Sequence, residues 1–385
     1  MKLEGIKVLD LSMFLPGPHL TMMMADHGAD VIRVESHEGE PSRGLGKFHE
    51  GTSIWFRNTH RNKRSVVLNL KHTEGVAAFL RLAQEADVVV EAFRAGVVDR
   101  LGVGYEAVKA VNPRIVYCSI SAFGQKGPNA RRVAHDLSIE AESGLVALNV
   151  GSDGVPTLPC IPTADVTGSM MGLAGILMAL LRREKTGQGD YIDISMQDSL
   201  VSWLVNVISP VFGEKRDLVP SEERSLGGNA FYGIYRCADG QYMSLGGAEI
   251  KFAQNLLTAL GRPDLLDLCR MPPGRGQDPV REFLTQSFAE RPRAHWEEFL
   301  SKLDVCWAPV KGIKEAMDSE HIKARGMRLE FPDGDLHLGI PIQFTAEPGK
   351  VVPVAPGLGE HTEQALRNVG YTDEDLQRLK REGAL

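Results

Sequence analysis

Asp165 is the residue whose surroundings point most directly to chemistry. It stands in the segment PCIPTADVTGSMMGLAGIL, just before residues that are predicted to form a helix. An aspartate there commonly caps the helix by accepting hydrogen bonds from its free amides. The positive end of the helix dipole also favours an ionised carboxylate, which a carboxylate nucleophile or a base requires. The residue by itself leaves capping and catalysis both open.

A histidine and an acid, His135 and Asp136, form a second candidate pair thirty residues before Asp165. A histidine in such a place can be a buried, hydrogen-bonded residue with no chemical role. Asp136 can orient the ring or cap the helix that follows. In the functional interpretation, His135 exchanges a proton with a substrate.

A basic segment, HRNKRS at residues 60–65, is followed after a strand by Lys71. Such runs are usually solvated loops, and the alternative is a seat for the phosphates of an anionic cofactor. The sequence lacks GxGxxG after the first strand, where LSMFLPGPH stands instead, and it also lacks GxxxxGK[ST], HExxH and GxSxG. Nicotinamide-binding, P-loop, zinc-protease and serine-hydrolase functions therefore lose their main support.

Short apolar strands alternating with helices would position these candidates. The hydrophobic pattern predicts strands at residues 6–12, 29–35, 65–70, 87–93, 114–121 and 191–196, and helices at 16–28, 73–86 and 169–183. Apolar strands joined by helices indicate a parallel sheet covered on both faces. The predicted class is α/β with a Rossmann-like large domain.

The chain of 385 residues is long for one core and predicts two domains. We expect a large domain at residues 1–211, a linker at 212–226 and a smaller α+β domain at 227–310 that opens with a hairpin, FYGIYRC and YMSLGG. The segment 311–385 is expected to return to the large domain, with a strand in HLGIPIQF and a final amphipathic helix in TDEDLQRLKREG.

The composition is that of an ordinary globular protein, with 43% hydrophobic and 24% charged residues and a net charge of −7. This balance gives no reason to expect nucleic-acid or membrane binding. The longest apolar helix, predicted near residues 170–181, is too short to span a bilayer, and the N-terminus does not resemble a signal peptide. The scattered cysteines fit reduced thiols: Cys118, Cys160, Cys237, Cys269 and Cys306. We therefore expect a cytoplasmic protein.

Taken in order, several segments resemble the class III CoA-transferases, the family of formyl-CoA transferase and of the carnitine and bile-acid CoA enzymes. The α-methylacyl-CoA racemases belong to the same superfamily. The resemblance covers essentially the whole chain, through LEGIKVLDLS, ADHGADVIRVE, RNKRSVVLNLK, EAFRAGVVDRLG, NPRIVYCSISAFGQKGP, the Asp165 segment and LGEHTEQAL. It implies a large domain built from both chain ends, a small domain from the middle, and two such subunits interlaced as an intertwined homodimer.

The resemblance also implies a reaction and a set of site residues. In the transferases, the aspartate that matches Asp165 attacks an acyl-CoA and forms covalent acyl and CoA intermediates before an acceptor acid takes the CoA. CoA and acyl-CoA are then substrates, and neither a resident cofactor nor a metal is implied. The matching CoA-contact positions are Leu15, Leu68, Lys71, Phe93, Arg100 and Met196. Amides in the small domain could stabilise oxyanions, at Gly227, Gly228, Gly246 and Gly247.

A racemase is the alternative within the same resemblance. Racemases place a base on each face of the carbon next to the thioester, and His135 and Asp165 have the matching spacing, with Glu249 near the position of a further glutamate. The segments RNKRSVVLNLK and ADVTGSM are closer to the transferases, so transferase is the favoured prediction. A catalytically silent partner subunit of a heteromeric transferase is a third alternative, against which the presence of Asp165 argues.

Overall fold

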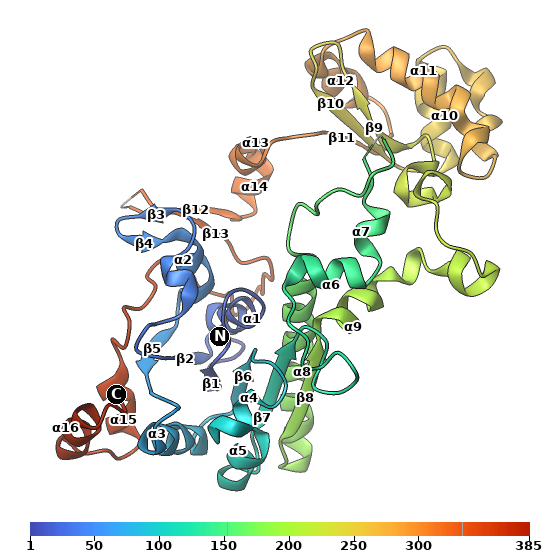
Figure 1. The fold of residues 1–385 in the computed structure, drawn as a ribbon. Helices are drawn as coiled ribbons and strands as arrows, with labels where there is room; N and C mark the ends of the chain where they lie inside the picture. Colours follow the sequence, from blue (N-terminus) through green and yellow to red (C-terminus); the bar gives the residue numbers. More distant parts are fainter. Residues whose placement is uncertain (152, 333) are drawn as a thin grey trace. The chain divides into compact units, whose positions relative to one another are not determined.

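The computed structural model describes residues 1–151, 153–332 and 334–385. The chain divides into two compact units. The first comprises Met1–Gly144, Leu158–Trp203 and Glu320–Leu385, and the second Leu145–Thr157 and Leu204–Ser319. The first unit thus contains both chain ends, and the second is built mainly from the segment between them (Figure 1).

A six-stranded sheet with only parallel pairs forms the centre of the first unit, as the strand pattern predicted. Its order is β5-β2-β1-β6-β7-β8, from β1 (Lys7–Asp10), β2 (Asp30–Glu35), β5 (Arg64–Val67), β6 (Val88–Glu91), β7 (Val116–Ser121) and β8 (Asp190–Ser195). The chain runs outward from β1 to one edge and then crosses to β6 on its other side. Doubly wound sheets bind ligands outside the carboxyl ends of the strands at such a reversal point.

Helices cover the sheet because its central strands are mainly apolar and buried. Every residue of β6 and β7 is buried. The core on one face includes Phe79, Val89 and Tyr117. The helices of this unit are α1 (Pro16–Asp26), α2 (Ile54–His60), α3 (Thr73–Gln84), α4 (Val97–Leu101), α5 (Tyr105–Val111), α6 (Asp136–Glu142), α8 (Thr163–Thr186), α9 (Met196–Val201), α14 (Glu320–Ala324), α15 (Thr362–Asn368) and α16 (Asp373–Arg381).

Helix α8 corrects the predicted length of the apolar helix. It has 24 residues rather than the twelve of 170–181, and by length and composition alone it could cross a membrane; it is the only such helix in the part of the chain that the structure describes. One side packs against α1, α9, β7 and β8. The close approach to α1 depends on Gly172, where an added Cβ would lie 2.6 Å from Leu20 Cδ1.

The C-terminal segment packs on the first unit beside α3 and β5 (Figure 1). The amide of His361 donates to the Ser65 carbonyl at 2.9 Å, and Arg378 pairs with Glu74 of α3 at 3.0 Å. Helix α16 is the predicted amphipathic helix. The strand predicted in HLGIPIQF is largely wrong, because only its first two residues lie in β13 (Leu336–Leu338), which pairs with β12 (Arg328–Glu330) alone.

The second unit contains the predicted hairpin, β9 (Tyr232–Arg236) and β10 (Tyr242–Gly246), joined by β11 (Trp307–Pro309) in an antiparallel sheet. Its main helices are α10 (Ile250–Ala259), α11 (Asp278–Ala289) and α12 (Arg293–Leu300), with α7 (Leu145–Leu148) and α13 (Ile313–Asp318). A separate core, including Phe231, Phe288 and Trp296, holds the unit together. The expected linker region contains short helical turns at Pro210–Glu214 and Pro220–Glu222.

Candidate active site

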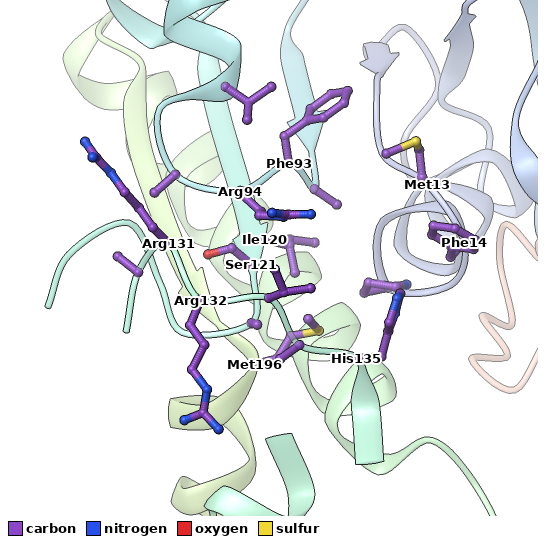
Figure 2. Close-up of a pocket in the computed structure, with 18 of the residues that line it drawn as sticks. Met13, Phe14, Phe93, Arg94, Ile120, Ser121, Arg131, Arg132, His135 and Met196 are labelled. Carbon is purple, nitrogen blue, oxygen red and sulfur yellow. The ribbon is translucent and has the colours of Figure 1, made fainter. Parts of the chain in front are cut away.

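A cavity of about 580 Å³ opens at the carboxyl ends of β1, β6 and β7 in the first unit. Met13 and Phe14 follow β1, Ala92 and Phe93 follow β6, and Ser121 ends β7. Strands β1 and β6 flank the reversal point of the sheet, and β7 lies next to β6. Figure 2 shows Phe14 and His135 on one side of this pocket and Arg131 and Arg132 on the other. Asp165 is also a lining residue.

The first turn of α8 is capped by α6, not by Asp165. Asp136 Oδ1 accepts hydrogen bonds from the amides of Ala164 and Asp165 at 2.8 and 3.1 Å. Glu140 accepts from the amide of Thr163 at 2.8 Å. In the described chain the carboxyl group of Asp165 accepts no hydrogen bond. Asp136 is therefore a capping residue of α8 and Asp165 is not, so the Asp165 carboxyl is left free in the pocket.

Three carboxyl groups gather at this point without a cation paired to any of them in the described structure. Burial raises the pKa of Asp165 to about 7, and the negative charges of Asp136 and Glu140 add to the effect. Burial likewise raises the pKa of Asp136 to about 6, although the hydrogen bonds that it accepts from two amides oppose this shift. Desolvation and like charges both disfavour the ionised form of a carboxyl group. Asp165 can therefore gain or lose a proton near neutral pH.

His135 lies at the same pocket with its ring exposed. The ring meets the edge of Phe14 in a T-shaped contact with the centroids 5.9 Å apart. Phe14 has φ 62°, a left-handed backbone conformation that is uncommon for a residue other than glycine. Glu40 Oε1 accepts the Phe14 amide at 2.8 Å and so holds this conformation. Backbone strain held by surrounding contacts is found preferentially at functional sites.

The residues predicted to contact CoA divide between two neighbouring cavities. Phe93, Arg100 and Met196 line the pocket of Asp165. Leu68, Lys71 and Phe93 line a second cavity of about 420 Å³. Phe93 therefore lies between the two cavities. Leu15 is the exception: both its neighbours line the first pocket, but it is not a lining residue of either cavity among the described residues.

Several residues at the site were not predicted from the sequence. Arg94 lines the pocket beside Phe93, and Arg131 and Arg132 line it upstream of His135. The two upstream arginines were visible in the sequence, but only the fold shows that they share a cavity with Asp165. Glu140 was missed because a buried acid near the end of a short helix has no sequence signal of its own.

The basic segment is not a solvated loop, and its buried cations are not a phosphate seat, whereas Lys71 is exposed and its phosphate role stays a prediction. Arg61 and Lys63 are buried, with exposures of 1% and 5%. Arg61 pairs with Asp26 at 2.6 Å, and Lys63 pairs with Asp10 at 3.1 Å. The charges of both residues are used inside the first unit and are not free for a ligand.

Glu249 belongs to the second unit, where it precedes α10 and lies 4.0 Å from Arg224. The expected oxyanion role of the glycine amides is weakened by their backbone hydrogen bonds. The amides of Gly228, Gly246 and Gly247 donate to the carbonyls of Glu223, Cys306 and Phe231. Within the described residues, no group of three or more His, Cys, Asp or Glu side chains could hold a metal ion.

Comparison with known proteins identifies the family. The model of CoA-transferase family III matches residues 3–362. The human α-methylacyl-CoA racemase is 33% identical over 98% of this chain and 96% of its own length. The acetyl-CoA:oxalate CoA-transferase of Acetobacter aceti is 31% identical over 93% of each chain. The crystal structure of a CaiB/BaiF family protein from Brucella suis superposes with a TM-score of 0.80 at 30% identity, covering 95% of this chain and 99% of that one. This chain belongs to CoA-transferase family III.

Proposed function

We propose that this protein is a CoA-transferase that moves CoA from an acyl-CoA to a carboxylic acid, with Asp165 as the covalent nucleophile. The free carboxyl group of Asp165 supports this proposal most directly. Asp136 and Glu140 take the amides of the first turn of α8, so no hydrogen bond in the described structure has to break before Asp165 attacks. A nucleophile that faces a cavity and has no competing partner is suited to covalent catalysis.

After Asp165 has attacked the substrate, its side-chain carbonyl is attacked twice, first by CoA thiolate and then by the acceptor carboxylate. The carboxylate adds to the thioester carbonyl and expels CoA thiolate, which leaves an acyl-aspartyl anhydride. The thiolate attacks the aspartyl carbonyl, releases the first acid and forms an aspartyl-CoA thioester. The acceptor carboxylate attacks this thioester and gives a second anhydride, and the thiolate then attacks its acyl carbonyl, which yields the new acyl-CoA and restores Asp165. Each step is an acyl transfer, and no resident cofactor is required.

The two cavities offer places for the two ends of CoA. We place the thioester end in the cavity of Asp165 and the nucleotide end in the cavity of Leu68 and Lys71, with the ring of Phe93 between them. Lys71 and Arg100 are exposed and make no ion pair in the described chain, so their charges are available to phosphate groups. Lys71→Ala is then expected to raise KM for the acyl-CoA while leaving kcat nearly unchanged.

Racemisation of a 2-methylacyl-CoA is the second candidate, and one observation favours it. His135 and Asp165 line the same cavity, and the pKa of Asp165 is raised to about 7, which suits a base that takes and returns a proton. The α-proton would pass to one of these residues and return from the other. The 33% identity to the human racemase is in keeping with this alternative.

Trapping and isotope exchange separate the two reactions. The protein is incubated with a panel of acyl-CoAs and acids, quenched with hydroxylamine or borohydride and digested for mass spectrometry, and a parallel sample is run in heavy water. A transferase gives an adduct on Asp165 and acceptor-dependent CoA exchange, both lost in Asp165→Asn. Asp267→Asn, whose side chain is 96% exposed in the second unit, is the matched control. Deuterium at the α-carbon without an adduct or exchange would establish the racemase instead.

We also propose that the functional form is an intertwined homodimer. The side of α8 away from the sheet exposes apolar side chains that a monomer would leave in water, at Met170, Leu177, Met178 and Leu181. A second subunit would bury them. Light scattering of the purified protein tests this proposal, since a monomer at micromolar concentration would contradict it.

A further inference from the structure

Glu140 is a fully buried acid that takes part in no chemical step of the proposed reaction. Its side chain has 0% exposure. One carboxyl oxygen accepts the Thr163 amide at 2.8 Å, while Oε2 is buried and accepts no hydrogen bond in the described structure, and the Asp136 carboxyl is its charged neighbour. Burying a carboxylate without a cation is costly, so its presence needs a physical explanation.

The position of Glu140 connects it to Asp165 in two ways. Glu140 and Asp136, which lies one turn earlier on α6, cap α8 together. They accept the hydrogen bonds of the Thr163, Ala164 and Asp165 amides. The charge of Glu140 also faces the same small volume as the two aspartates. A neighbouring negative charge raises the proton affinity of a desolvated carboxyl group, here that of Asp165.

We propose that Glu140 is a positioning residue for Asp165, which fixes the first turn of α8 so that the Asp165 carboxyl stays free and faces a second buried negative charge. The inference rests on the proposed role of Asp165 as the reacting carboxyl. Glu140 contacts neither substrate nor the reacting atoms in this scheme. It acts through the helix turn and through its electric field.

Other titratable groups lie on the elements packed against α8, but they are not causes of the raised pKa of Asp165. They include His19 on α1, His135 before α6 and Asp198 on α9. In the described structure the raised pKa of Asp165 comes from burial first and then from Asp136 and Glu140. Removal of the Glu140 charge should therefore lower the pKa of Asp165, while Asp136 still caps the turn.

Glu140→Gln separates charge from structure, because glutamine keeps an acceptor for the Thr163 amide and loses the charge. The measurement is the pH dependence of carbodiimide labelling of Asp165, trapped with glycine ethyl ester and quantified by mass spectrometry, since carbodiimide reacts with protonated carboxyl groups. We expect the labelling midpoint to fall by about 0.5–1 pH unit. Glu184→Gln, exposed near the other end of α8, should leave it unchanged. An unchanged midpoint in Glu140→Gln, or an equal shift in Glu184→Gln, would overturn the proposal.

The labelling needs no substrate, so it still reports on Glu140 if neither CoA exchange nor racemisation is found. In the active enzyme, the acid limb of the kcat/KM profile should move to lower pH by the same amount in Glu140→Gln. Glu140→Leu removes the acceptor as well as the charge, and we expect the same midpoint shift together with a lower melting temperature. If the leucine variant does not fold, the glutamine variant still decides the question.

Discussion

Two aspartates of the first unit, the buried Asp10 and the half-buried Asp165, have opposite protonation behaviour. Asp10 lies beside Lys63 at 3.1 Å and Arg33 at 3.3 Å, and both cations are themselves buried. Burial alone would raise the pKa of Asp10, but these charges and the hydroxyl groups of Ser12 and Thr21 lower it to about 2. Among the described residues, Asp165 has only other carboxyl groups as charged neighbours, and burial raises its pKa to about 7.

The difference in charged neighbours distinguishes Asp10, which stabilises the fold, from Asp165 in the candidate site. At Asp10 every charge has a partner, so the cluster holds β1, α1 and the basic segment together and has nothing left to offer a ligand. At Asp165 no cationic partner is present among the residues that the structure describes, so burial makes the ionised carboxylate costly. Groups held in such conditions cluster at functional sites, where stability is given up for reactivity.

Asp165→Asn should have the largest effect on function. We expect acceptor-dependent CoA exchange to fall by about 10³-fold or more, because no covalent intermediate can form on the amide. Initial rates with saturating acyl-CoA and acid measure this loss. Retention of a tenth of the exchange activity would show that Asp165 is not the nucleophile.

Asp10→Asn should have the largest effect on stability. It leaves Lys63 and Arg33 buried without their carboxylate, and breaking such a cluster costs about 3–5 kcal/mol. Urea unfolding at pH 7.5 measures the change in free energy of unfolding. A loss below 1 kcal/mol would mean that the cluster contributes little to the stability of the first unit.

The pH dependence of stability distinguishes the same two sites. The folded-state pKa of Asp165 is above its unfolded value, so the folded protein binds the extra proton and loses this stabilisation as pH rises from about 4 to about 7. Asp165→Asn removes the titration. We expect the variant to gain about 1–3 kcal/mol over the parent at pH 8 and to have no such advantage at pH 4. The same stability difference between the variant and the parent at pH 8 and at pH 4 would contradict the raised pKa of Asp165.

Gly168→Ala should have the smallest effect. The added Cβ would lie 2.7 Å from Cγ of Met196, a flexible residue of the Asp165 pocket, so Met196 must move. We expect a loss of about 1 kcal/mol in stability and a several-fold rise in KM for the acyl-CoA. Gly213→Ala is the control, since its added methyl group meets no atom within 4 Å. Equal effects of both variants would show that the contact with Met196 is not responsible.

Much of the scaffold followed from the sequence because its signals are local. The apolar runs 87–93 and 114–121 became β6 and β7, and the hairpin of β9 and β10 formed around its ADGQ turn. The strand in HLGIPIQF was largely wrong, and the apolar helix at 170–181 is the middle of a longer helix, α8. Apolar patterning does not show where a strand finds a partner or how far a helix continues past its most apolar residues.

The sequence by itself determined the family resemblance and the parallel sheet and predicted Asp165 as the central residue, since motif order and hydrophobic periodicity are read along the chain. Only the tertiary structure decided what surrounds each charge. It paired Arg61 and Lys63 with Asp26 and Asp10, gave the cap of α8 to Asp136 and Glu140, and placed no cation of the described chain beside the Asp165 carboxyl. These outcomes depend on residues tens of positions apart, and electrostatic energies depend on distance in space and on burial, which no local pattern contains.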